Sequence, residues 1–186
     1  MAYRFDGQKG KLTPATPAVI PMKAGSGPRH MAFRPDGRFA YVVSTKTSTV
    51  TAFAYDARTG ALKEVQAVSS LPESFEGANT AAEVAVHPSG KWLYVSNRGH
   101  NSVVLFTIDA EKGTLTYVEE QGTGGKTPLH FGIEPSAKHM AICNQASNTV
   151  LASRIDAGNG RLKPSGVFAD VAGPTCVKFL PPPEGR

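Results

Sequence analysis

Four equivalent positions along this chain, about fifty residues apart, are each occupied by a histidine, a glutamate or a cysteine. The four positions are His30, Glu83, His130 and Cys176. An imidazole or a carboxylate can act as a general base toward water, and an arginine such as Arg98 can stabilise the oxyanion that forms when water attacks a carbonyl. If the fold brings these side chains together, the chemistry that they suit is hydrolysis.

Two sequence motifs repeat along the chain and indicate the elements that must position these residues. The pattern apolar-Asp-x-x-x-Gly-x-Leu occurs four times, beginning at Phe5, Tyr55, Ile108 and Ile155. Segments that end in proline, HMAFRP, EVAVHP, HFGIEP and CVKFLP, repeat with a similar period. Within one unit, residues 30–34, 39–44, 49–55 and 61–68 are typical of short strands bounded by Pro, Asp and Gly turns. Helical periodicity is absent, so we expect an all-β protein, a β-propeller of four-stranded antiparallel blades.

We expect the chain to form a single partial β-propeller domain with about three and a half blades. The predicted boundaries are residues 1–24 for the end of one blade, 25–75, 76–125 and 126–170 for three full blades, and 171–186 for the first strand of a closing blade. Fewer than four blades cannot close a ring, which leaves each end of the array uncovered. The chain is therefore expected to need a missing N-terminal half, or a second copy in a homo-oligomer, to complete the ring.

Propeller geometry predicts which of these residues can meet. The starts of the inner strands and the loops between the second and third strands lie at one end of the blades, the top, while the Asp-x-x-x-Gly turns lie at the bottom. We predict that His30, Glu83 and Arg98 are catalytic residues at the top. The predicted substrate-binding residues at the same end are Arg29, Asn97, His100, His130, Asn144 and Gln145.

Structural roles compete with each functional interpretation. Glu83 could form a buried ion pair with a neighbouring blade, His30 could cap loop carbonyls, and Arg98 could be a solvated loop charge. His87 and His139 fall near the bottom turns and are expected on the surface. Trp92 is better explained by packing between blades than by stacking on a ligand.

Composition argues against several classes of protein. The net charge of +5 is spread without a basic run, which disfavours nucleic-acid binding and favours an anionic small molecule. Two cysteines are too few for a disulfide framework and lack metal-ligand spacing, so both are expected to be buried free thiols. With a carboxylate at only one of the four inner-strand positions, we expect no metal.

Nothing in the chain predicts a membrane segment. The longest apolar runs are far shorter than a spanning helix, and no charged-then-apolar leader follows Met1. We therefore expect a soluble, cytoplasmic protein, unless a missing N-terminal segment carries an export signal.

Several segments resemble a known family. GPRHMAFRPDGRFAYVV, AAEVAVHPSGKWLYVSNRGHNSV, PSAKHMAICNQASNTV and GPTCVKFLP are similar to the seven-bladed β-propeller lactonase family, which includes propeller-type 6-phosphogluconolactonases and carboxymuconate cyclases. The resemblance covers essentially the whole chain and implies that it is the C-terminal half of a seven-bladed ring. It implies hydrolysis of a sugar lactone without a required cofactor, by His30, Glu83 and Arg98 at the channel mouth, with Arg29 adjacent.

The chain departs from the family pattern at two pairs of residues. Ser44-Thr45 stands where Asn-Glu is usual, and Leu129-His130 stands where Arg-Asn or Arg-His is usual. One acidic and one basic group are thereby absent from the rim, which bears on phosphate recognition and on full activity.

The primary hypothesis is a lactonase that opens a sugar lactone such as 6-phosphogluconolactone. Glu83 or His30 would take a proton from water, and Arg98 would stabilise the oxyanion. The alternative is a propeller that binds or scaffolds without catalysis, because fold does not determine function. A third hypothesis is a lactone-forming enzyme like the muconate cyclases.

Overall fold

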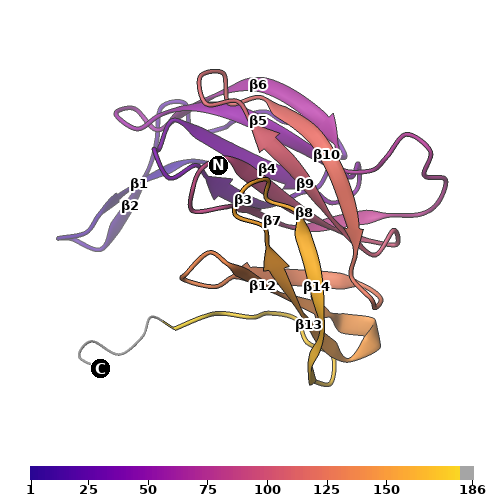
Figure 1. The fold of residues 1–186 in the computed structure, drawn as a ribbon. Coiled ribbons are helices and arrows are strands. Elements are labelled where there is room, and N and C mark those ends of the chain that lie inside the picture. The colour runs from indigo at the N-terminus through magenta and orange to yellow at the C-terminus, as the bar shows by residue number, and fades with distance from the viewer. Residues whose placement is uncertain (181–186) are drawn as a thin grey trace.

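The computed structural model describes residues 1–180, which form a hairpin followed by three four-stranded antiparallel sheets (Figure 1). The hairpin consists of β1 (Tyr3–Asp6) and β2 (Lys11–Pro14). The first sheet consists of β3 (Pro28–Phe33), β4 (Phe39–Ser44), β5 (Thr49–Asp56) and β6 (Ala61–Ser69). The second consists of β7 (Thr80–Val86), β8 (Trp92–Arg98), β9 (Ser102–Ile108) and β10 (Leu115–Gly122). The third consists of β11 (Pro128–Ile133), β12 (His139–Asn144), β13 (Thr149–Ile155) and β14 (Leu162–Asp170).

Each of the three sheets is a meander in which strands pair with their neighbours in chain order. This is the arrangement of a propeller blade, and it confirms the predicted all-β, partial-propeller fold. The helical part of the described residues is the short 3₁₀ turn η1 (Gln145–Ser147). Within residues 1–180, no helix has the length and apolar character that crossing a bilayer requires.

The repeated aspartates build the turns at the bottom of the blades. Oδ1 of Asp109 accepts the backbone N–H groups of Lys112 at 2.8 Å and Glu111 at 2.9 Å. Asp56 and Asp156 bond to their own turns in the same way. These amide donors lower the pKa of the Asp109 carboxyl, because they stabilise its charged form.

The glycine that closes each bottom turn makes room for the neighbouring blade. Gly160 has a φ of 76°, and a Cβ at this position would lie 2.6 Å from the Trp92 ring of the preceding blade. The carbonyl of Gly160 also accepts the hydroxyl of buried Tyr94 at 2.6 Å. Gly113 meets aromatic residues of the first blade in the same manner. Gly60, in the first blade, has nothing within 4 Å of a Cβ position, because no described blade packs against it there.

Two apolar clusters fill the spaces between consecutive blades. The cluster between the first and second sheets includes Phe39, Tyr41 and Phe106. The cluster between the second and third sheets includes Trp92 and Phe131. The predicted packing of Trp92 between blades is therefore confirmed.

His87 is buried, so the prediction that it lies on the surface is wrong. Its side chain contacts the third blade, where Nε2 lies 3.0 Å from the carbonyl oxygen of Ala137, and its ring meets the edge of Trp92 at 4.8 Å. A bottom turn of the neighbouring blade covers it, and a single repeat unit could not reveal that cover. His139 is exposed, as expected.

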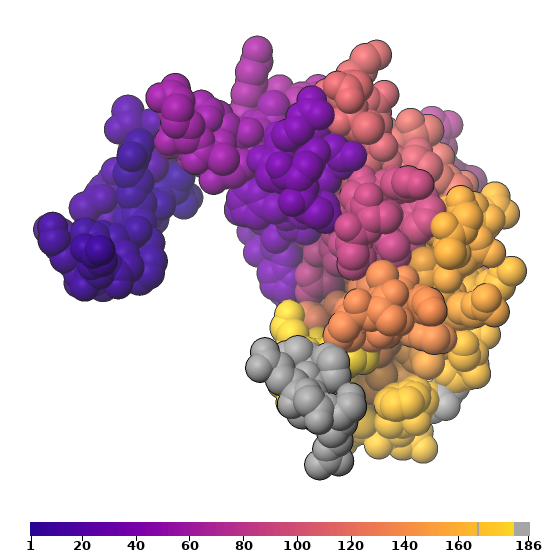
Figure 2. Space-filling model, turned by 60° about the vertical axis from the view of Figure 1, so that its left-hand side comes forward, coloured from indigo at the N-terminus to yellow at the C-terminus, as the bar shows by residue number. Residues whose placement is uncertain are grey.

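The N-terminal side of the three-blade array is open. Met31 and Phe33 on β3 are 47% and 45% exposed. A cleft of about 780 Å³ separates β3 from the β1–β2 hairpin, which stands away from the body of the molecule (indigo in Figure 2).

Residues 176–180 form no hydrogen-bonded strand, contrary to the prediction of a closing strand. The segment runs in a stretched path (yellow in Figure 1) along the third sheet. Its Val177 and Phe179 side chains lie against Gly132 of β11, where a Cβ would be 3.4 Å and 3.3 Å from them. The segment thus covers the face of β11, and none of the described strands pairs with its edge. The repeat proline Pro181 lies outside the described residues.

Candidate active site

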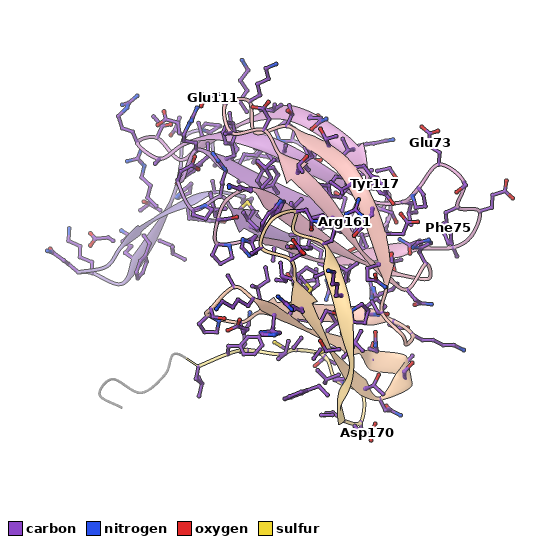
Figure 3. All side chains as sticks on the ribbon, viewed as in Figure 1. Glu73, Phe75, Glu111, Tyr117, Arg161 and Asp170 are labelled. Atoms are coloured by element: carbon purple, nitrogen blue, oxygen red, sulfur yellow. The ribbon has the colours of Figure 1, made fainter. Side chains whose placement is uncertain are left out.

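The two ends of the blades are clearly separated in space. Figure 3 shows Glu111, in the bottom turn between β9 and β10, and Phe75, in the loop between β6 and β7, at opposite ends of the sheets. The inner strands β3, β7 and β11 begin at the top, the end where Phe75 lies. The predicted site residues belong to this end.

Each inner strand begins with a β-bulge. The register of pairing shifts between Pro28 and His30, between Ala81 and Val84, and between Pro128 and His130. A bulge inserts an extra residue and re-aims the side chains around it, and bulges are common beside active sites. The same local irregularity therefore presents a polar side chain from each of three blades.

These three side chains meet in a row. Oε2 of Glu83 lies 2.9 Å from Nδ1 of His30 and 3.2 Å from Nε2 of His130. Nε2 of His130 in turn lies 3.8 Å from Sγ of Cys176. The four positions that the repeat placed at the starts of inner strands are therefore in contact, in blade order.

The Glu83 carboxylate is held firmly at the centre of this row. The backbone N–H of Glu83, at the bulge, donates a hydrogen bond to the hydroxyl of Ser96 at 3.0 Å. Oε1 of Glu83 accepts a hydrogen bond from the backbone N–H of Val84 at 3.1 Å. The Glu83 side chain is 11% exposed and that of His130 is 10% exposed, whereas that of His30 is 40% exposed. His30 is thus the member of the row that solvent reaches, and its Nδ1 is directed to Glu83, which leaves Nε2 free to act. Sequence reasoning missed Ser96, whose signal is its position on β8 opposite the bulge.

Two arginines add positive charge at this end. Nε of Arg98 donates to the carbonyl oxygen of Thr80 at 3.4 Å, which ties the side chain to the start of β7. Burial lowers the pKa of the Arg98 guanidinium, and the charge of Arg29 lowers it further. The positive charges of Arg29 and of exposed Lys178 both lower the pKa of His130. Since arginine stays protonated in proteins, the mouth of the site is positive and suits an anionic ligand.

Two residues predicted to bind substrate, Asn97 and Asn144, take part in the packing of the top loops. Asn97 is fully buried, its Oδ1 accepts from Ser70 Oγ at 2.9 Å, and its Nδ2 donates to the Ser70 carbonyl at 2.6 Å. Asn144 is 1% exposed, and its Nδ2 donates to the carbonyl oxygen of Thr123 at 2.9 Å. Both asparagines hold the chain segment that follows the preceding blade, so neither presents its amide to the mouth.

The structure places two further predicted residues away from the row. His100 is half-buried in the second blade, with Nδ1 2.7 Å from Ser102 Oγ and its ring against the edge of Phe75 at 4.8 Å. Gln145 opens η1, and its amide donates to the Thr127 carbonyl at 2.9 Å. The row of contacts thus includes neither residue.

The two cysteines differ in exposure. Cys143 is buried, and burial raises the pKa of its thiol. Cys176 is exposed, so the prediction of two buried thiols is wrong for Cys176, which lies on the stretched segment rather than inside a blade. Within residues 1–180, no group of His, Cys, Asp and Glu side chains is arranged to hold a metal ion.

Comparison with known proteins agrees with this architecture. The model of a family described as "Lactonase, 7-bladed beta-propeller" matches residues 1–179. The chain is 33% identical over 156 residues to the 6-phosphogluconolactonase of Bacillus subtilis (strain 168), an alignment that covers 84% of this chain and 45% of that protein.

Solved structures show the same fold. The chain superimposes on the periplasmic gluconolactonase of Pseudomonas aeruginosa with a TM-score of 0.89 and 31% identity, covering 96% of this chain and 50% of that one. It superimposes on a putative 6-phosphogluconolactonase of Bacteroides fragilis with a TM-score of 0.87 and 32% identity, covering 96% and 51%. The chain therefore spans close to half the length of the relatives that it matches.

Proposed function

Because the chain belongs to the seven-bladed β-propeller lactonase family, we propose that it acts in the hydrolysis of a sugar lactone, with His30, Glu83 and Arg98 as its catalytic residues. The observation that carries this proposal is the 2.9 Å contact between His30 Nδ1 and Glu83 Oε2, made across two blades. A solvent-reached imidazole whose other nitrogen bonds to a buried carboxylate is the usual arrangement of a general base.

The geometry favours His30 over Glu83 as the base. Nε2 of His30 takes a proton from water as the water oxygen attacks the lactone carbonyl carbon. Glu83 accepts a hydrogen bond from the Nδ1–H group, which stays on the ring, and its negative charge stabilises the imidazolium that forms. When the ring C–O bond breaks, the imidazolium returns the proton to the departing oxygen, and the product is the open hydroxy acid. Arg98 stabilises the oxyanion of the tetrahedral intermediate.

The proposed substrate is an anionic lactone such as 6-phosphogluconolactone. Relatives with this activity in their names support the choice, and so does the positive charge of Arg29, Arg98 and Lys178 at the mouth. A neutral gluconolactone is the competing substrate, because the similar Pseudomonas aeruginosa protein is named a gluconolactonase. We expect kcat/KM for the phosphorylated lactone to exceed that for the neutral one, and the reverse order would refute the role of these charges.

The proposed site requires blades beyond the three described, since the relatives are about twice as long. These blades would come from a further segment or from a second copy of the chain. Light scattering combined with an activity assay separates the two sources. A monodisperse monomer that hydrolyses lactones would argue against a second copy.

Removal of the proposed base and its partner tests the function directly. We expect Glu83→Gln and His30→Ala each to reduce lactone hydrolysis, measured as the excess over the spontaneous rate, by about 10²- to 10⁴-fold. Equal rates for the variants and the unaltered protein would contradict the proposal.

A non-catalytic binding role is the second candidate function. It is favoured by the two departures from the family pattern, at Ser44-Thr45 and Leu129-His130. The hydroxyl of Ser44 is buried and has no hydrogen-bond partner among residues 1–180. Under this alternative, the protein would bind δ-lactones or the hydroxy acid by calorimetry while hydrolysis stayed at the spontaneous rate.

A further inference from the structure

We propose that His130 is a positioning residue rather than a substrate-binding one, and that the backbone of the segment after β14 sets its tautomer. In this arrangement the Val177 amide donates to Nδ1 of His130, the ring proton sits on Nε2, and that proton faces the Glu83 carboxylate. The inference rests on the proposed lactonase function for its kinetic consequence, but its structural core can be tested separately.

The first step is the burial of His130. Its side chain is 10% exposed, against 40% for His30, although both contact the same carboxylate oxygen. A ligand at the mouth therefore has much more of the His30 side chain to contact than of the His130 side chain. The proposal therefore gives His130 a positioning role in place of the predicted substrate-binding role.

The second step is the assignment of the ring proton. The backbone N–H of Val177 donates to Nδ1 of His130 at 3.4 Å, and a neutral imidazole nitrogen that accepts a hydrogen bond carries no proton. The proton must then be on Nε2, which lies 3.2 Å from Oε2 of Glu83 and 3.8 Å from Sγ of Cys176. His30 has the opposite tautomer, because its Nδ1 contacts Glu83.

The third step is the charge state. Burial lowers the pKa of His130, and the positive charges of Lys178 and Arg29 lower it too, while Glu83 raises it. The thiol of Cys176 is the other titratable group in contact with the ring. His130 is therefore neutral near pH 7, which keeps Nδ1 available as the acceptor for Val177.

The consequence is that one carboxylate oxygen accepts two hydrogen bonds, one from the Nδ1–H of His30 and one from the Nε2–H of His130. Glu83 is thereby fixed in the orientation that directs Nε2 of His30 toward the mouth. The segment that contains Val177 becomes part of the active site although it contributes only a backbone amide. The segment after β14 would then orient His130 in addition to packing against β11.

The structural test is ¹⁵N NMR of the imidazole nitrogens at neutral pH, with the His130 signals assigned by their loss in His130→Gln. We expect a protonated Nε2 and an acceptor-type Nδ1 for His130, and the reverse for His30. Val177→Pro removes the amide and should collapse the single-tautomer pattern of His130, whereas Val177→Ala keeps the amide and should preserve it. A protonated Nδ1 on His130, or a pattern unchanged in Val177→Pro, would overturn the proposal even if the protein is a lactonase.

The kinetic test compares two substitutions of His130. Glutamine can place an N–H near the position of Nε2, so His130→Gln should retain most of kcat, whereas His130→Leu should reduce kcat by about 10- to 100-fold with little change in KM. His139→Leu, at the exposed bottom of the third blade, is the matched control and should change neither. A rise in KM with unchanged kcat in His130→Leu would show substrate binding instead. If His130→Leu does not fold, the comparison of Val177→Pro with Val177→Ala still tests the tautomer of His130. If no form of the protein hydrolyses lactones, the proposed function fails, and the NMR result still decides the tautomer.

Discussion

The top and bottom ends of the blades are built from one repeat but use it in opposite ways. At the bottom, the same aspartate and glycine recur in every blade, and each turn makes the same internal hydrogen bonds. At the top, equivalent strand starts carry His30, Glu83, His130 and Cys176, and these side chains contact one another across blades. Equivalent positions therefore carry the same residue types where they build the bottom turns, and different residue types where they form the candidate site.

The largest effect that would test this comparison is the loss of a top-end charge. We expect Arg98→Met to reduce kcat/KM for lactone hydrolysis by about 10²- to 10³-fold, because an oxyanion donor is removed, with little change in the unfolding midpoint. Arg38→Met removes an exposed bottom-end arginine whose guanidinium donates hydrogen bonds to the turn of the next blade, and activity should persist. Similar losses in both variants would show that charge at either end matters equally.

The next effect concerns the joints between blades. Gly160→Ala adds a Cβ 2.6 Å from the Trp92 ring at a φ of 76°, so we expect a loss of about 2–4 kcal/mol in unfolding free energy, from strain and overpacking together.

Gly60→Ala is the matched control for Gly160→Ala. Gly60 has a φ of 78° but an empty neighbourhood, so the substitution should cost only the backbone term, about 1–2 kcal/mol. Urea denaturation measures both values. Equal losses would mean that the blade contact at Gly160 contributes nothing beyond backbone strain.

The smallest effect concerns acid stability at the bottom of the third blade. Hydrogen bonds from the Ser136 hydroxyl and from nearby amides lower the pKa of Glu134 to about 2. A carboxyl whose pKa is lower in the folded state stabilises the fold above its unfolded pKa, and this contribution is lost as the pH falls toward 2. Glu134→Gln should therefore unfold more easily near neutral pH, and the difference from the unaltered protein should vanish toward pH 2. Glu120→Gln, at an exposed position of β10, is the control for the loss of one negative charge.

Much of the fold could be predicted because it depends on local patterns. The strand segments and the bottom turns each involve residues a few positions apart, and the repeat shows them four times. The convergence of His30 with Glu83 also follows from the repeat, since equivalent strand starts of adjacent blades must be neighbours.

The remaining features depend on which segment of another blade covers a given side chain. Asn97 is polar and lies at the correct end, yet Ser70 and Asn79 use its amide and bury it. His87 is covered by a turn of the next blade. The sequence patterns contain no signal for either contact, because the partners lie far away along the chain.

The amino-acid sequence by itself determined the period of the repeat, the chemistry of the turns and the end of the blades at which the reactive side chains gather, since these depend on backbone preferences of nearby residues. Only the tertiary structure decided which of those side chains touch and which are buried. Those properties arise from contacts between different blades, where a bulge, a backbone amide or a covering loop sets distances that no local pattern encodes.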